Sequence, residues 1–108
     1  MNTTTNDRRK RKSAALRAKQ DKRYLAAIHE RRCLVCKRWP VEAHHEPPKQ
    51  MGGGGDWHDR KTVPLCDEHH NGSPRSIHAL GKEGFERAYR LDLNSEITKL
   101  QGEIDASK

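Results

Sequence analysis

The sequence predicts a small α+β domain that is stabilised by zinc, with a basic helical arm at the N-terminus and helices at the C-terminus. Three observations support this fold class. Of the 108 residues, only 31% are hydrophobic and 34% are charged, so apolar burial alone is a weak source of stability. All three cysteines lie in short motifs with metal-ligand spacing. Helix-forming segments flank a central region of short β-forming segments, glycines and prolines.

Composition also excludes some classes of protein. No segment approaches the roughly 18 apolar residues of a membrane span, and none resembles a signal peptide. We therefore expect a cytoplasmic protein with no membrane partner. Three cysteines are an odd number, which argues against a complete disulfide framework. Together with seven histidines, they favour metal ligation.

The N-terminal segment carries the excess positive charge. Residues 1–32 hold eleven Lys/Arg against three acidic residues, a net charge of +8, whereas the remainder is −1, which together give the +7 of the chain. Such an arm suits sequence-independent contact with DNA phosphates, and the alternative is a solubilising or poorly ordered tail. The candidate contacts are Arg8, Arg9, Lys10, Arg11, Lys12, Arg17, Lys19, Lys22 and Arg23.

Within this segment we expect disorder over residues 1–12, which are polar and run into a cluster of like charges. Residues 13–32 contain no Pro or Gly and are rich in Ala, Leu, Lys and Arg, so they predict one basic amphipathic helix with Ser13 as its N-cap. Leu16, Tyr24 and Ile28 fall on one face of that helix.

The central domain is expected over residues 33–93, followed by a C-terminal helix and tail over 94–108. A turn leads into a strand that ends at His45, and a second strand spans residues 62–66. Loops are expected at 46–61, which contains two prolines and four glycines, and at 71–76. A helical turn is predicted at 67–70, a helix at 82–93, and a weaker helix at 95–104 that begins at a Ser95 cap and buries Ile97, Leu100 and Ile104.

The cysteine motifs predict a structural zinc site. Cys33 and Cys36 have the spacing of a zinc knuckle, and Cys66 and His69 repeat that spacing thirty residues later. Three thiolates and one imidazole complete a closed tetrahedral set, which would supply folding free energy that a small core lacks. In the alternative, His69 is a surface residue and the fourth ligand lies elsewhere.

Four further histidines, His44, His45, His70 and His78, are not needed by that site. Adjacent side chains on a strand point to opposite sides, so one of His44 and His45 can bind a metal while the other acts as a base. Together with His70 and His78, the metal-binding member of this pair would give three imidazole ligands. A metal held by three imidazoles keeps open coordination positions, as catalytic metal sites do. In the alternative, all four are surface residues of loops. We assign no chemical role to His29 and His58.

The segments "CLVC", "AHH", "TVPLCDEHH" and "SIHALGKEGFERAY" resemble the HNH (ββα-metal, treble-clef-like) endonucleases. Within them, the likeness is greatest to small phage proteins typified by the Ref-like recombination-enhancement nucleases. It covers roughly residues 33–93 with order and spacing intact. The basic arm is also similar to the arm of Ref-like proteins, on composition alone.

The resemblance implies a role for each histidine of the motifs. Cys33, Cys36, Cys66 and His69 would hold the structural zinc. His44, His70 and His78 would bind a catalytic divalent metal, with Mg²⁺ or Mn²⁺ expected before Zn²⁺. His45 would be the general base that takes a proton from water, while the metal stabilises charge on the phosphate and the departing 3′ oxygen.

This sequence departs from the family pattern in two places. Thr62 stands where the family has the Asn that steadies the loop bearing the base. His70 and His78 are eight residues apart, more than the single helical turn of many HNH enzymes. Residues 71–76 must therefore fold back if His78 is to reach the metal.

Two functions remain at this point. The first is a metal-dependent DNA endonuclease with little sequence specificity, since no helix shows a base-reading pattern. The family likeness adds a phage and recombination association and a RecA-type recombinase filament as a partner. The alternative is a non-catalytic zinc-knuckle protein that binds DNA or assists recombination. Oligomeric state, the preferred DNA structure, and nicking versus double-strand cleavage are left open.

Overall fold

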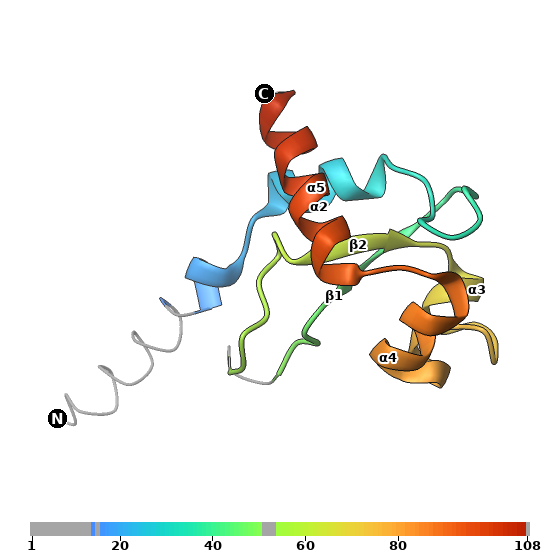
Figure 1. The fold of residues 1–108 in the computed structure, drawn as a ribbon. Coiled ribbons are helices and arrows are strands. Elements are labelled where there is room, and N and C mark those ends of the chain that lie inside the picture. The colour runs from blue at the N-terminus through green and yellow to red at the C-terminus, as the bar shows by residue number, and fades with distance from the viewer. Residues whose placement is uncertain (1–13, 15, 51–53, 108) are drawn as a thin grey trace, which may run out of the picture.

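The computed structural model describes residues 14, 16–50 and 54–107 (Figure 1). The expected disorder of residues 1–12 and the Ser13 cap lie outside this part. The elements follow in the order α2 (Lys22–His29), β1 (Glu42–His45), β2 (Thr62–Leu65), α3 (Asp67–His70), α4 (Ile77–Tyr89) and α5 (Leu93–Ala106). Residues 14 and 16–19 are also helical.

The two strands form an antiparallel sheet at the centre of a small α+β fold. Their register pairs Glu42 with Leu65, His44 with Val63, and His45 with Thr62. All four residues of β2 are buried, because α2 and α5 pack against this strand. Helices α3 and α4 lie at one end of the hairpin (Figure 1). The predicted strands and the helical turn at 67–70 are therefore confirmed.

The single basic helix predicted over residues 13–32 is wrong, because the described part is interrupted at Gln20 and Asp21. Asp21 has a non-helical backbone, with a ψ of 88°, and is the N-cap of α2, with its carboxylate accepting from the Tyr24 N–H. Its own backbone N–H donates to Asp59 at 2.8 Å. A tertiary hydrogen bond therefore competes with helix continuation. Leu16 is 36% exposed, outside the core that contains Tyr24 and Ile28.

The C-terminal helix boundaries also differ from the prediction over residues 82–93. Helix α4 begins earlier, at Ile77, where the Ser76 hydroxyl caps the Ala79 N–H, and it kinks at Gly81 with a φ of +75°. Chain reversal at Arg90, which adopts a left-handed conformation, ends α4 before Leu93. Helix α5 is capped by Asp92, whose carboxylate accepts from Ser95, so the predicted Ser95 cap is wrong.

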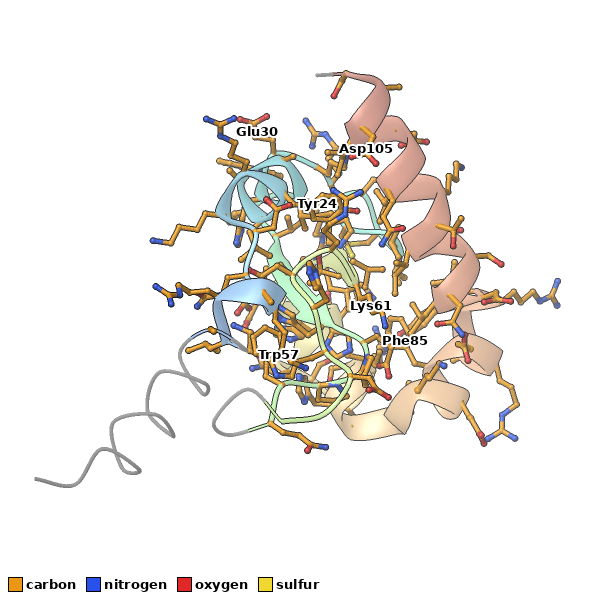
Figure 2. All side chains as sticks on the ribbon, turned by 90° about the vertical axis from the view of Figure 1, so that its left-hand side faces the viewer. Tyr24, Glu30, Trp57, Lys61, Phe85 and Asp105 are labelled. Atoms are coloured by element: carbon orange, nitrogen blue, oxygen red, sulfur yellow. The ribbon has the colours of Figure 1, made fainter. Side chains whose placement is uncertain are left out.

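One hydrophobic core joins the sheet to the helices. The predicted stripe of α5 is confirmed, since Ile97, Leu100 and Ile104 are all buried. Phe85 of α4 is fully buried and belongs to the same core (Figure 2). Cys33 and Cys66 also belong to this core, so the cysteine motifs lie inside the packed structure. No helix in the described ranges is both long and apolar enough to cross a bilayer.

Candidate metal centres

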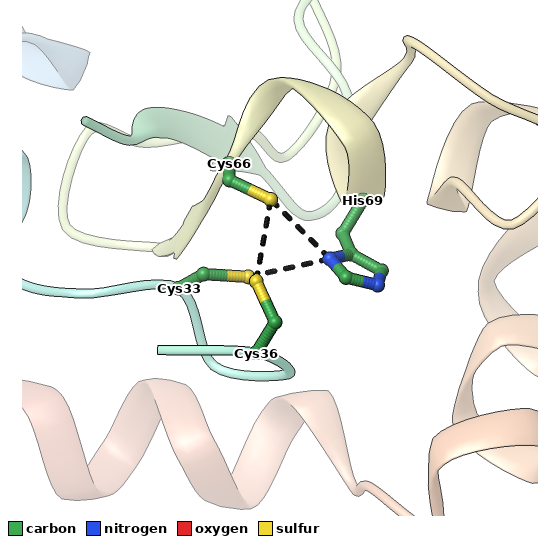
Figure 3. A group of neighbouring side chains, drawn as sticks. All are labelled: Cys33, Cys36, Cys66 and His69. Carbon is green, nitrogen blue, oxygen red and sulfur yellow. Dashed lines mark hydrogen bonds between the residues drawn. The ribbon is translucent and has the colours of Figure 1, made fainter. Parts of the chain in front are cut away.

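The three cysteines and His69 form a cluster at the junction of three segments, in which all but the half-buried Cys36 are buried (Figure 3). Cys33 and Cys36 lie on a tight turn closed by the hydrogen bond from the Lys37 N–H to the Cys33 carbonyl. Cys66 directly follows β2, and His69 lies one turn later in α3. All four ligand atoms are within 4.8 Å of one another. The group could therefore hold a metal ion.

The distances suit a tetrahedral zinc. With bonds of about 2.3 Å to sulfur and about 2.0 Å to nitrogen, a regular tetrahedron separates two sulfurs by about 3.8 Å and a sulfur from a nitrogen by about 3.5 Å. Cys36 Sγ and Cys66 Sγ are 3.6 Å apart. His69 Nδ1 lies 3.3 Å from Cys66 Sγ and 3.7 Å from Cys33 Sγ. The ring nitrogen facing the thiols is thus Nδ1.

Electrostatics within the cluster also favour a cation. Burial and the neighbouring thiols raise the pKa of Cys66 to about 11. For Cys33, burial acts in the same direction, but backbone N–H donors from Cys66, Cys36 and Val35 outweigh it and lower the pKa. Because the thiols are close together, the negative charges of two thiolates would repel each other. A divalent cation bound between them would relieve that repulsion.

A second cluster contains His44 from β1, His70 from α3 and His78 from α4. One ring nitrogen from each lies within 4.8 Å of the others, and the Nε2 atoms of His70 and His78 are 3.1 Å apart. Two imidazole nitrogens sharing a tetrahedral zinc would be about 3.3 Å apart. The donor set therefore fits a divalent metal with nitrogen ligands.

His78 reaches this cluster because residues 71–76 fold back on α3. The Gly72 N–H bonds the Asp67 carbonyl at 2.7 Å, and the Ser73 hydroxyl bonds the Glu68 carbonyl at 2.8 Å. A Cβ at Gly72 would lie 2.9 Å from the Asp67 carbonyl oxygen, so the close approach requires glycine. The eight-residue spacing is thus compatible with a shared site.

Burial and neighbouring charge keep His44 in the neutral form that binds metals. Burial, followed by the neighbouring His70 and His78, lowers the pKa of His44 to about 4, so its ring is neutral near pH 7. Two carboxylates adjoin the cluster: Glu46 Oε2 is 3.2 Å from His44 Nε2, and Glu42 Oε1 is 3.5 Å from His70 Nδ1. Carboxylates beside metal-binding imidazoles commonly orient the rings.

His45 has different partners from its neighbour His44, as alternation along a strand requires. Its Nε2 lies 2.8 Å from Asp59 Oδ1, and its ring meets the buried Trp57 edge-on at 5.7 Å between centroids. Burial lowers the pKa of His45, and the charge of Lys49 acts in the same direction, while the bond to Asp59 opposes both. A neutral imidazole is the form that accepts a proton.

Sequence reasoning missed three carboxylates, Glu42, Glu46 and Asp59, because no motif spacing marks them. Alternation in β1 offers a weak signal for Glu42 and Glu46, since both share a parity with His44. Asp59 lies in a glycine-rich loop, where acidic residues are common, and carried no signal. Thr62 helps to hold this loop in place beside His45, because its hydroxyl donates to the Asp59 carbonyl at 2.9 Å.

The remaining candidates are distributed as follows. Arg8 to Lys12 lie outside the described residues, and Arg17, Lys22 and Arg23 are exposed. Lys19 is half-buried, with its ammonium bonded to the Gly55 carbonyl and placed 5.4 Å from the Trp57 ring centroid. His29 and His58 each bond a backbone carbonyl, at Val41 and Ala18.

Comparison of the chain with protein-family models, with curated proteins and with solved structures finds no match.

Proposed function

We propose that this protein is a metal-dependent endonuclease of the HNH type, which hydrolyses DNA phosphodiester bonds with little sequence specificity. The observation that carries the proposal is that five histidines fall into three different settings. One imidazole completes a cysteine cluster, three meet in a second cluster, and His45, which follows His44 in β1, has a buried carboxylate on its ring. A protein that only binds DNA has no use for this second set.

The arrangement of elements supports the same proposal. The order β1, β2, α3 puts His44 on the first strand and His70 on the helix that follows the hairpin. This is the order expected for a ββα-metal domain. The cysteine cluster would bind a structural zinc, and the basic residues of the N-terminal arm would contact phosphates without reading bases.

A metal at the second cluster would be held by His44, His70 and His78. An all-imidazole set suits Zn²⁺ or Ni²⁺ better than Mg²⁺ or Mn²⁺, which prefer oxygen ligands. Bound there, the metal would supply Lewis-acid stabilisation of charge on a phosphate. The neutral ring of His45 would take the proton from the attacking water.

The test is a nicking assay on supercoiled plasmid with purified, zinc-loaded protein. Wild type should convert plasmid to the open-circular or linear form with Mn²⁺, Ni²⁺, Zn²⁺ or Mg²⁺ in the buffer. His45→Ala should lower the rate by about 10²- to 10⁴-fold, the usual contribution of a general base. His29→Gln is the matched control, because His29 is exposed and outside both clusters, and it should retain the wild-type rate.

DNA binding and zinc content must be measured on the same samples. Wild type that binds DNA and zinc but does not nick with any of these metals, alone or with a RecA-type filament, would refute the proposal. That result would favour the non-catalytic DNA-binding function. Nicking that survives His45→Ala would instead refute the role of His45.

A further inference from the structure

Asp59 is a buried carboxylate that joins two elements of the fold. The residue is only 2% exposed, although it lies in the loop that precedes β2. Its Oδ1 atom is 2.8 Å from His45 Nε2, and its Oδ2 atom accepts from the Asp21 N–H at 2.8 Å. Both carboxylate oxygens are therefore engaged, one by the ring and one by the backbone.

A short segment before α2, residues 18–21, fixes the loop that carries Asp59. The Asp59 N–H donates to the Lys19 carbonyl at 2.9 Å, and His58 Nε2 lies 3.0 Å from the Ala18 carbonyl. On the other side, Thr62 holds the Asp59 carbonyl. The carboxylate consequently approaches His45 from a backbone that is tied at several points, which is what a precise orientation requires.

The contact determines which nitrogen of His45 carries the proton. A carboxylate oxygen only accepts, so Nε2 of the neutral ring must be the protonated nitrogen. The lone pair available to accept a proton is then on Nδ1. The same logic governs a histidine base held by a carboxylate in other hydrolases, where the wrong tautomer removes most of the activity.

We propose that Asp59 is the positioning residue of His45: it sets the tautomer and the ring orientation, and residues 18–21 hold it in place. This inference rests on the proposed function, in which His45 is the base. It gives the N-terminal segment a part in the site beyond contact with DNA phosphates.

Asp59→Asn tests the assignment with little change of shape. An amide has one acceptor oxygen, whereas Asp59 accepts from two donors. The Asp21 N–H is fixed as a donor, so the amide oxygen should turn to it and the NH₂ group should face His45. The ring then has to accept at Nε2 and carry its proton on Nδ1. Asp56→Asn, an exposed position in the same loop, is the matched control.

The first readout is the ¹⁵N spectrum of the His45 ring in full-length, zinc-loaded protein at pH 7.5, without a second metal. Wild type and Asp56→Asn should show protonated Nε2, and Asp59→Asn should show protonated Nδ1. Protonated Nδ1 in wild type would overturn the proposal whether or not the variant folds, as would an unchanged tautomer in Asp59→Asn.

The second readout is the nicking rate at saturating DNA and metal. Asp59→Asn should lower kcat by about 10²-fold or more with little change in KM. In a His45→Ala background the same substitution should add no further loss. An equal loss in both backgrounds would show a general structural role and overturn the proposal. If wild type does not nick, but the His45 tautomer still differs between wild type and Asp59→Asn as expected, the role of Asp59 is supported and the nuclease function alone is refuted.

Discussion

The cysteine cluster offers the sharpest test of what holds this domain together. Cys36 is the ligand to change, because it is half-buried, whereas Cys33 and Cys66 are buried. Replacement by serine keeps the size of the side chain but removes the thiolate. The effect on stability therefore reports the metal rather than the apolar contacts.

The expected magnitude follows from the ligand set. A structural zinc bound by four ligands contributes roughly 10–16 kcal/mol of apparent free energy, or about 2.5–4 kcal/mol for each ligand. Small domains have total stabilities of about 5–15 kcal/mol. Cys36→Ser should therefore leave the domain unstable or unfolded at room temperature, and full removal of zinc should unfold it. Val35→Ser, in the same turn, removes a half-buried side chain that is not a ligand and should cost about 0.5–3 kcal/mol.

Two measurements decide the matter. Elemental analysis of wild type purified without added metal should find one zinc per chain, or two if the histidine cluster also retains zinc. Denaturant unfolding with and without a chelator should show that the cooperative transition depends on the metal. Folded protein that carries well under one zinc per chain, or a loss for Cys36→Ser no larger than for Val35→Ser, would refute the reasoning.

Three other predictions concern separate parts of the molecule. His44 is neutral in the fold with its pKa lowered to about 4, whereas the unfolded chain takes up the proton near its ordinary value of 6.5; stability should therefore fall by up to about 3 kcal/mol as pH drops from 6.5 to 4, and urea unfolding of His44→Asn should lack this part of the slope. Phe85→Ala should cost about 3–5 kcal/mol by denaturant unfolding because Phe85 is 0% exposed, and Leu80→Ala, at 40% exposed, should cost under about 1 kcal/mol. Deletion of residues 1–12 should weaken DNA binding, measured by fluorescence anisotropy. The slope of the logarithm of the binding constant against the logarithm of the salt concentration should become less negative by as much as about 4. Unchanged binding would favour the solubilising tail.

Much of the fold followed from residue types that have few alternative uses. Paired ligands at short spacing indicated the cluster of Cys33, Cys36, Cys66 and His69 before any geometry was known, because four such residues in a chain with little core rarely have another purpose. The stripe of α5 followed from helical periodicity. These signals are local or chemically specific, so they do not depend on how the chain packs.

The errors arose where distant parts of the chain decide local structure. The break at Gln20 and Asp21 depends on the Asp59 carboxylate, which is 38 residues away in the sequence. Helix propensity over 13–32 contains no trace of this acceptor, since the segment has no Pro or Gly and is rich in Ala, Leu, Lys and Arg. The pairing of Asp59 with His45 was missed for the same reason.

Helix α3 explains why the two clusters depend on each other. Its four residues contain His69 and His70, and neighbouring residues on a helix differ by about 100° in direction, so one side chain meets the cysteines while the other meets His44 and His78. A helix this short has no independent stability. A metal at the cysteine cluster would fix α3 through His69 and would thereby present His70 to the second cluster. By thermodynamic linkage the reverse also holds: a metal at the histidine cluster would fix α3 through His70 and would thereby present His69 to the cysteines. Occupancy of either cluster should therefore favour metal binding at the other by the same coupling free energy.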